Sequence, residues 1–157
     1  MAGTVEARIA VPASRAELFD RLVRLENHWD LADRWVEVVS LNGQPANGGI
    51  VKLHGPLGLS RTAQTTVDLV EPPGLIEGTA RIGSHTRGKV SWSLAEAPGG
   101  TDVTLRGELV EAGLMDRAVW VLGGRRWMTR RLRITLERLR EAYGDPAAEN
   151  AARADAG

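Results

Sequence analysis

The residues best suited to acid–base chemistry in this chain are its three histidines, and the chain contains no cysteine. His28 stands next to Trp29 and Asp30. A carboxylate beside an imidazole can orient it as a general base. The other interpretation, a histidine at the surface or in a satisfied structural role, is the commoner one. We therefore keep His28 and Asp30, together with Arg131, as catalytic candidates only and assign no catalytic residue.

The other two histidines give no compact constellation. His54 alternates in phase with Lys52, which predicts a place on the outer face of its strand. His85 is in a turn, where it would be solvated or would touch a ligand at the edge of a pocket. No two histidines have the HxH or HxxxH spacing that brings imidazoles to one metal ion. We predict neither a metal site nor a cofactor, and the lack of cysteine excludes disulfides and thiolate chemistry.

Arg131 lies in the most arginine-rich part of the chain, residues 113–143. At helical pitch this segment has one broad apolar stripe, formed by Leu114, Val121, Met128, Leu132, Leu136, Leu139 and Tyr143. A second stripe is formed by Trp120, Trp127 and Ile134. Arg131 falls between the two stripes, in the sector expected to face whatever the helix covers. There its guanidinium could hold the carboxylate or enolate of an apolar ligand, or it could reach past the apolar surface to a nearby acidic side chain.

The Gly123-Gly124 pair interrupts the same helical segment. Glycine inside a helix costs about 1 kcal/mol relative to alanine. We expect the pair to kink the helix, or to let a ligand or a strand approach it closely.

Segments that alternate apolar and polar residues precede this helix. The alternation predicts strands over residues 5–11, 35–41, 50–54, 61–71, 75–82, 86–95 and 101–110. A capping box, Ser14 to Glu17, begins a helix after the first strand, and a second short helix or turn is expected over residues 26–34. Short turns between successive strands predict an antiparallel meander with one face toward water.

Several inward-facing strand positions hold unusually small residues. These are Ala63, Gly78, Ala80, Gly88 and Gly107. One interpretation is that large indoles from Trp92, Trp120 and Trp127 fill the space, because protein interiors are close-packed. The other is an enclosed apolar cavity that receives a ligand. The pattern alone leaves both open.

Five stretches together resemble the START-like superfamily, which includes the polyketide cyclase/dehydrase and lipid-transport group and the birch-pollen-allergen-type proteins. They are VEARIAVPASRAELFDRLVRLENHW, DRWVEVVSL, the turn EPPG, GGTDVTL and RRWMTRRLRITLERL. The resemblance covers about residues 5–143 and consists of element order and apolar positions. It implies an α+β helix-grip fold: a seven-stranded antiparallel sheet curved around a long C-terminal helix, with two short helices between strands 1 and 2.

The resemblance also implies a hydrophobic pocket between the sheet and the last helix. Members bind lipids, sterols, polyketides or plant-hormone-like molecules, a minority catalyse cyclisation or dehydration, and no universal catalytic residue transfers. The mouth is expected near residues 55–60, 83–85 and 111–115, and the apolar tip 56–59 is either a flap over it or an ordinary loop. The ligand-binding residues predicted here are Trp29, Leu57, Leu59, Ala63, Gly78, Ala80, Trp92, Leu105, Trp120, Trp127, Met128 and Arg131.

Length and charge bound what the chain can be. We expect one START-like domain over residues 1–143 and a disordered tail over residues 144–157. A formal net charge of zero argues against a nucleic-acid partner. No apolar run reaches the length of a signal peptide or a membrane span, so we expect a cytoplasmic protein without stable membrane insertion, as a monomer or weak homodimer.

Three functional classes follow from these observations. The first is a carrier or sensor that binds a hydrophobic small molecule (a lipid, a polyketide or an aromatic compound) between the sheet and the C-terminal helix. The second is a small polyketide cyclase or dehydratase that uses an acid or base in the pocket. The third is a protein-interaction module without a ligand, which would dock its arginine-rich helix on acidic partners. The lack of a compact acid–base constellation favours the first.

Overall fold

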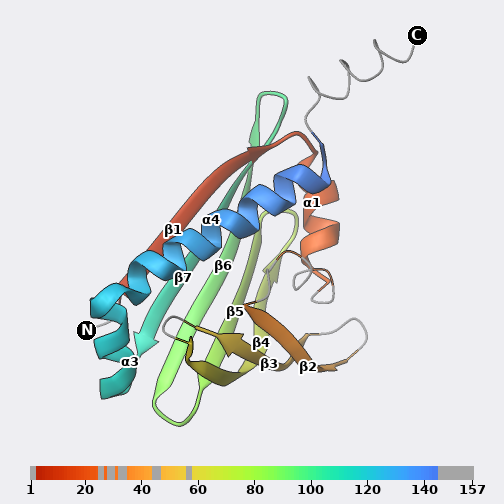
Figure 1. Cartoon of the computed structure of the whole chain (residues 1–157). Helices are drawn as coiled ribbons and strands as arrows, with labels where there is room; N and C mark the ends of the chain where they lie inside the picture. Colours follow the sequence, from red (N-terminus) through yellow and green to blue (C-terminus); the bar gives the residue numbers. More distant parts are fainter. Residues whose placement is uncertain are drawn as a thin grey trace, which may run out of the picture.

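A computed structural model describes residues 3–24, 27, 31, 35–43, 47–55 and 58–144. In this part of the chain a seven-stranded antiparallel sheet is combined with one short helix and a long C-terminal helical segment (Figure 1). The strands are β1 Gly3–Val11, β2 Val36–Asn42, β3 Gly48–His54, β4 Ser60–Glu71, β5 Leu75–Ile82, β6 Thr86–Ala97 and β7 Gly100–Glu111. Their order in the sheet is β1-β7-β6-β5-β4-β3-β2. All seven predicted strands are present, and the predicted helix-grip architecture is confirmed.

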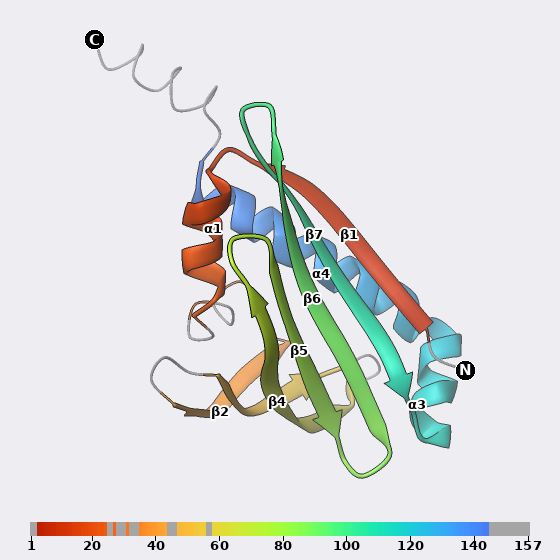
Figure 2. The same cartoon turned by 180° about the vertical axis from the view of Figure 1, so that it is seen from behind.

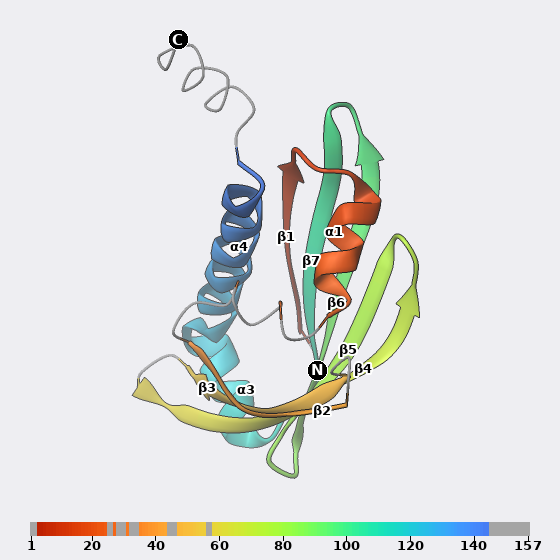
Figure 3. The same cartoon turned by 90° about the vertical axis from the view of Figure 1, so that its right-hand side faces the viewer.

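The sheet curves because its register is interrupted. Bulges or irregularities occur between Val38 and Ser40, between Val67 and Leu69, and between Arg87 and Gly88. Figure 3 shows the result, with β1, β7 and β6 beside the long helix and β2 and β3 running across one end of it. Seen from behind, in Figure 2, the sheet lies in front of that helix and turns its outer face to the viewer.

The helix α1, Arg15–Leu22, begins where the capping box predicts it. The backbone N–H of Glu17 donates to the Ser14 hydroxyl oxygen over 3.2 Å, which satisfies one of the free donors at the helix start. Its buried side is formed by Leu18, Phe19 and Leu22. The second predicted helix, residues 26–34, falls almost entirely outside the described residues, as does the predicted tail beyond Gly144.

The C-terminal helical segment is divided into three parts. An α-helix, α3 (Leu114–Val119), is followed by a π-helical turn, η2 (Trp120–Gly124), and then by α4 (Arg125–Ala142). Gly123 has a φ of 133°, a conformation that side chains other than glycine rarely adopt. The kink expected at Gly123-Gly124 is therefore present.

This kink overturns part of the predicted apolar stripe. The helical wheel puts Leu114 and Val121 on the buried face with Leu136, yet they are 86% and 81% exposed. A helical wheel assumes one constant rotation per residue, and the backbone of Gly123 resets the phase. Only the part of the stripe that follows the break faces the core.

The core lies between α4, α1 and the β1–β7–β6 part of the sheet. Leu132, Leu136 and Leu139 of α4 are buried in one cluster with side chains of α1 and of the strands. The helix α4 packs against β1 and β7. The side chains at this end of the molecule are closely packed, and they fix the position of the long helix relative to the sheet.

Candidate ligand-binding site

A cavity of about 250 Å³ lies between the concave face of the sheet and the C-terminal helical segment. All seven strands or their first flanking residues, η2 and α4 contribute to its wall. Three of the residues on the helix side are Trp120, Met128 and Leu132. On the sheet side, the inward positions of each strand contribute, since successive side chains alternate between the two faces.

The small inward-facing residues adjoin this space. Ala63, Gly78, Ala80, Gly88 and Gly107 all line the cavity. At Gly78 a second reason for glycine exists, because a Cβ there would lie 2.7 Å from the Thr66 carbonyl oxygen. The β4–β5 irregularity brings that backbone close. Small residues therefore serve both the curvature of the sheet and the space beneath it.

Seven of the predicted ligand-binding residues line the cavity. They are Ala63, Gly78, Ala80, Trp92, Leu105, Trp120 and Met128. Leu59 is 40% exposed and lies outside the lining, as do Trp127 and Arg131. Trp29 and Leu57, and the catalytic candidates His28 and Asp30, lie outside the described residues. Whether the lining residues bind a ligand stays a prediction.

The helical wheel predicts Arg131 at the cavity wall, but in the structure its side chain lies against an aromatic ring. Its guanidinium carbon lies 5.4 Å from the centre of the Trp127 ring, in a cation–π contact. Trp127 in turn meets Trp35 edge to face, with ring centres 5.5 Å apart and planes at 87°. Trp35 does line the cavity, and it was not among the predicted site residues. Its place at the start of a strand gave no signal for this role.

The polar groups around the cavity are nearly all engaged within the protein. The hydroxyls of Thr65 and Thr135 donate to the carbonyl oxygens of Gly49 and Arg131, over 3.3 and 2.9 Å. The Thr86 hydroxyl donates to Asp116. The wall consequently offers apolar surface and few donors.

Charged residues at the sheet border belong to its other face. Glu77, Lys89 and Glu108 adjoin the cavity, but each alternates with an inward residue such as Ile76, so the side chain points outward. Lys89 and Glu77 form an ion pair with each other at 3.1 Å. Their charged groups are therefore expected on the outer face of the sheet.

Trp35 is the exception among the lining residues. Its indole Nε1 is buried and has no hydrogen-bond partner in the described part of the chain. A buried N–H without an acceptor costs on the order of 1–3 kcal/mol. An acceptor supplied by a bound molecule would recover part of that cost.

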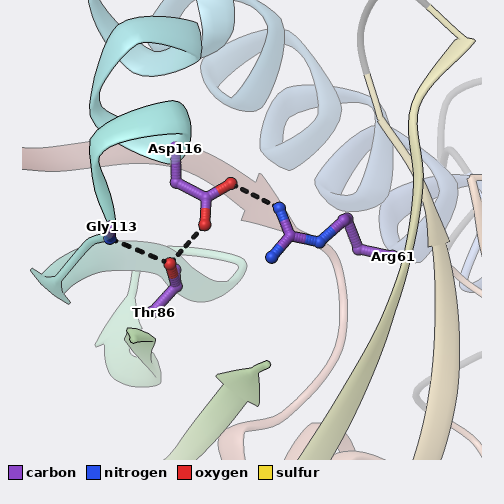
Figure 4. Close-up of polar contacts among 4 residues, drawn as sticks. All are labelled: Arg61, Thr86, Gly113 and Asp116. Carbon is purple, nitrogen blue, oxygen red and sulfur yellow. Dashed lines mark hydrogen bonds and ion pairs between the residues drawn. The ribbon is translucent and has the colours of Figure 1, made fainter. Parts of the chain in front are cut away.

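A polar cluster closes one edge of the site (Figure 4). Arg61 Nη1 of β4 lies 2.7 Å from one carboxylate oxygen of Asp116 in α3, and the Thr86 hydroxyl of β6 donates to the other. The backbone N–H of Gly113 donates to the Thr86 oxygen over 3.3 Å. Both oxygens of Asp116 are engaged, so its carboxylate connects α3 to the sheet.

The same cluster brings two of the three predicted mouth segments together. A Cβ placed on Gly113 would lie 3.5 Å from that of His85, and one on Gly83 would lie 3.6 Å from Arg61 Nη2. Residues 83–85 and 111–115 are thus neighbours at one end of the sheet. His85 is exposed there.

His54 has no relation to the cavity wall. Its Nδ1 is 3.1 Å from the Ser60 hydroxyl, and its Nε2 is 3.5 Å from a Glu37 carboxylate oxygen. Within the described residues, no group of three or more histidine, aspartate or glutamate side chains is arranged to hold a metal ion. In the same part of the chain, no helix has both the length and the apolar character needed to span a membrane.

The amino-acid sequence matches the model of one protein family. The model of a family described as polyketide cyclase / dehydrase and lipid transport matches residues 2–144. The chain belongs to this family. No curated protein matches it in sequence.

Solved structures show the same fold at low sequence identity. The chain is similar to the KanY protein (ms6282), with a TM-score of 0.72 at 14% identity, covering 92% of this chain and 99% of the other. It is similar to TTHA0849 from Thermus thermophilus, with a TM-score of 0.68 at 15% identity, covering 88% and 95%. It is also similar to the di-domain ARO/CYC BexL of the BE-7585A biosynthetic pathway, with a TM-score of 0.65 at 15% identity, covering 92% of this chain and 50% of that one. At these identities the likeness concerns the fold alone.

Proposed function

We propose that this protein binds a hydrophobic small molecule in the cavity between its sheet and its C-terminal helical segment, as a carrier or sensor. The observation that carries the proposal is an apolar wall in which the hydroxyls of Thr65, Thr86 and Thr135 donate hydrogen bonds within the protein. Apolar surface moved from water into such a space gains about 25 cal/mol per Å². Because these hydroxyls already donate hydrogen bonds within the protein, they give a strongly polar ligand no additional stabilisation.

The volume of the cavity and the buried Trp35 N–H, which has no partner among the described residues, narrow the class of ligand. A cavity of about 250 Å³ is at the small end of ligand sites, which run from roughly 300 to 1,000 Å³. We infer a compact molecule, such as a fused aromatic or a short acyl compound. The buried Trp35 N–H favours one that carries a carbonyl, hydroxyl or carboxylate oxygen at one end.

A second function, polyketide cyclisation or dehydration, is favoured by the family and by the likeness to an ARO/CYC protein. Such chemistry needs an acid or a base at the substrate. The candidates are His28, Asp30 and, less directly, Arg131. Turnover of a poly-β-keto substrate that is lost in His28→Ala or Arg131→Ala would move the protein into this class, and turnover unchanged by both would remove these residues from it.

Ligand binding is tested by filling the cavity. Ala80 lines the cavity on β5, and Ser91 is an outward position on the neighbouring strand β6. We expect Ala80→Leu to weaken binding of a naphthyl or fatty-acyl fluorescent probe by about tenfold or more, because the added carbons take the volume of roughly three ligand methylenes. Ser91→Leu is the control and should bind as the unaltered protein does. Native mass spectrometry of the gently purified protein gives a second readout.

Two results would contradict the carrier proposal. One is a protein that carries no co-purified compound and whose tryptophan fluorescence ignores a panel of hydrophobic ligands. The other is an Ala80→Leu variant that binds the probe unchanged, which would place the probe elsewhere.

A further inference from the structure

A cluster of exposed aliphatic side chains lies at the start of the C-terminal helical segment. Among the described residues, five large hydrophobic side chains are more than half exposed, and four of them are Leu114, Met115, Val121 and Leu122. Their exposed fractions run from 65% to 86%. Single exposed apolar residues are ordinary, but four within nine positions of two successive helical turns form a patch. We call these four residues the α3–η2 patch.

Three exposed arginines lie close to this patch in sequence. Arg117 lies within it in sequence and Arg125 and Arg126 follow it directly, and all three are exposed. Residues 113–143 as a whole contain eight arginines and three acidic residues, a net charge of +5, in a chain whose total is zero. One of the acidic residues, Asp116, is paired with Arg61. The helical segment that contains the patch therefore has a net positive charge.

We propose that the α3–η2 patch docks peripherally on the surface of an anionic lipid bilayer. Aliphatic side chains flanked by arginines match the two layers of such a surface, the acyl boundary and the negative headgroups. A second copy of this chain at the same patch would set positive faces against each other, which opposes self-association there. The proposal does not depend on what the cavity binds.

The place of the patch gives docking a consequence. Trp120 of η2 lines the cavity, and Val121 and Leu122 follow it in the chain on the exposed side. The polar cluster of Arg61, Thr86 and Asp116 fastens α3 to the sheet at the same end. Docking would set this wall of the cavity against the lipid surface, where an apolar molecule could pass between bilayer and protein.

The experiment is sedimentation of the full chain with vesicles. We expect binding to vesicles of equal parts phosphatidylcholine and phosphatidylglycerol, and little binding to pure phosphatidylcholine. Arg125→Glu/Arg126→Glu should weaken this binding by at least about tenfold. Val121→Ser/Leu122→Ser should weaken it by at least about fivefold, because two aliphatic contacts are lost.

Matched controls are available elsewhere on the surface. Arg81 and Arg106 are exposed on the outer face of the sheet, and their double change to glutamate removes the same charge. Val38 and Val39 are 38% and 62% exposed on β2, and their double change to serine also removes two exposed aliphatic side chains. Both controls should sediment with vesicles nearly as the unaltered protein does. Thermal unfolding confirms that each variant folds.

A site-specific probe separates docking from general attraction. Because the chain has no cysteine, Leu122→Cys and Val39→Cys can each carry a single environment-sensitive fluorophore. We expect a blue shift on anionic vesicles for the label at position 122 and none for the label at position 39. A label at 122 that stays in water, or vesicle binding unchanged by Val121→Ser/Leu122→Ser, would overturn the proposal. Binding to polyglutamate but not to vesicles would assign the patch to an acidic protein and would also overturn it.

Discussion

The two ends of the C-terminal helical segment contain similar aliphatic residues in opposite surroundings. In α4, Leu136 and Leu139 are 1% and 0% exposed, and they pack with α1 and β1. In α3 and η2, Leu114 and Leu122 are 86% and 82% exposed. The break at Gly123 separates the two ends.

The difference teaches how a small domain can be stable and still have a space inside it. The packed end gains its free energy from apolar burial, which does not depend on the cavity. The other end is held by a few polar contacts to Asp116 and borders the cavity through Trp120. Elements that admit a ligand are usually drawn from the less stable parts of a fold. The comparison therefore places most of the stabilising apolar burial at one end of the helical segment and the exposed aliphatic residues at the other.

The largest effect expected is on the packed end. Leu136→Ala removes a side chain with 1% exposure, and we expect a loss of about 2–5 kcal/mol in the free energy of unfolding. Leu122→Ala, the matched change at the exposed end, should alter it by less than about 0.5 kcal/mol. Urea unfolding followed by far-UV circular dichroism measures both. Equal losses in the two variants would show that the ends do not differ as described.

A smaller and local effect is expected at the fastening of α3. Asp116→Ala removes the acceptor of both Arg61 and Thr86. Arg61 is 39% exposed on its side chain, so water replaces much of the lost contact, and we expect about 1 kcal/mol or less in total stability. Hydrogen exchange should quicken by up to about fivefold at the amides of residues 113–124 and stay unchanged in residues 132–139.

Thr86→Val is the companion variant, because it keeps the side-chain shape and removes only the hydroxyl. Its effect should be in the same segment and weaker. Exchange that quickens across all of α4 would mean that α3 and α4 open together, which would contradict the separation of the two ends.

The strands were predictable from sequence because their signal is local. Val103 and Leu105 are buried in β7 while Arg106 is exposed, as period-two alternation requires. The small residues that line the cavity could also be found this way, because Gly88 and Gly107 stand at inward positions of strands that otherwise read clearly. The resemblance to a family then supplied the sheet's curvature, which no single strand encodes.

The features that the sequence did not predict depend on the rotational phase of a helix or on contacts between residues far apart in the chain. Val121 was assigned to the core since a helical wheel carries one phase through Gly123, where the backbone changes direction. Trp35 reaches the cavity because β2 curves across one end of the sheet, and Arg61 meets Asp116 from 55 positions away. Such contacts are set by tertiary packing, and neither alternation nor spacing reports them.

The last prediction concerns ligand binding in the cavity, where the expected effect is small. Trp35→Phe removes the buried N–H that has no partner among the described residues and keeps an aromatic ring against Trp127. We expect it to weaken binding of a naphthyl ketone by about fivefold, near 1 kcal/mol, and to leave the matching alkyl naphthalene almost unchanged. Trp120→Phe also removes an indole from the cavity wall, but it should weaken both ligands alike through lost contact area. Calorimetric titration of the two ligands against the two variants gives this double difference. An equal loss for both ligands in Trp35→Phe would mean that the indole acts by its surface alone, and that the oxygen-bearing ligand class inferred above is wrong.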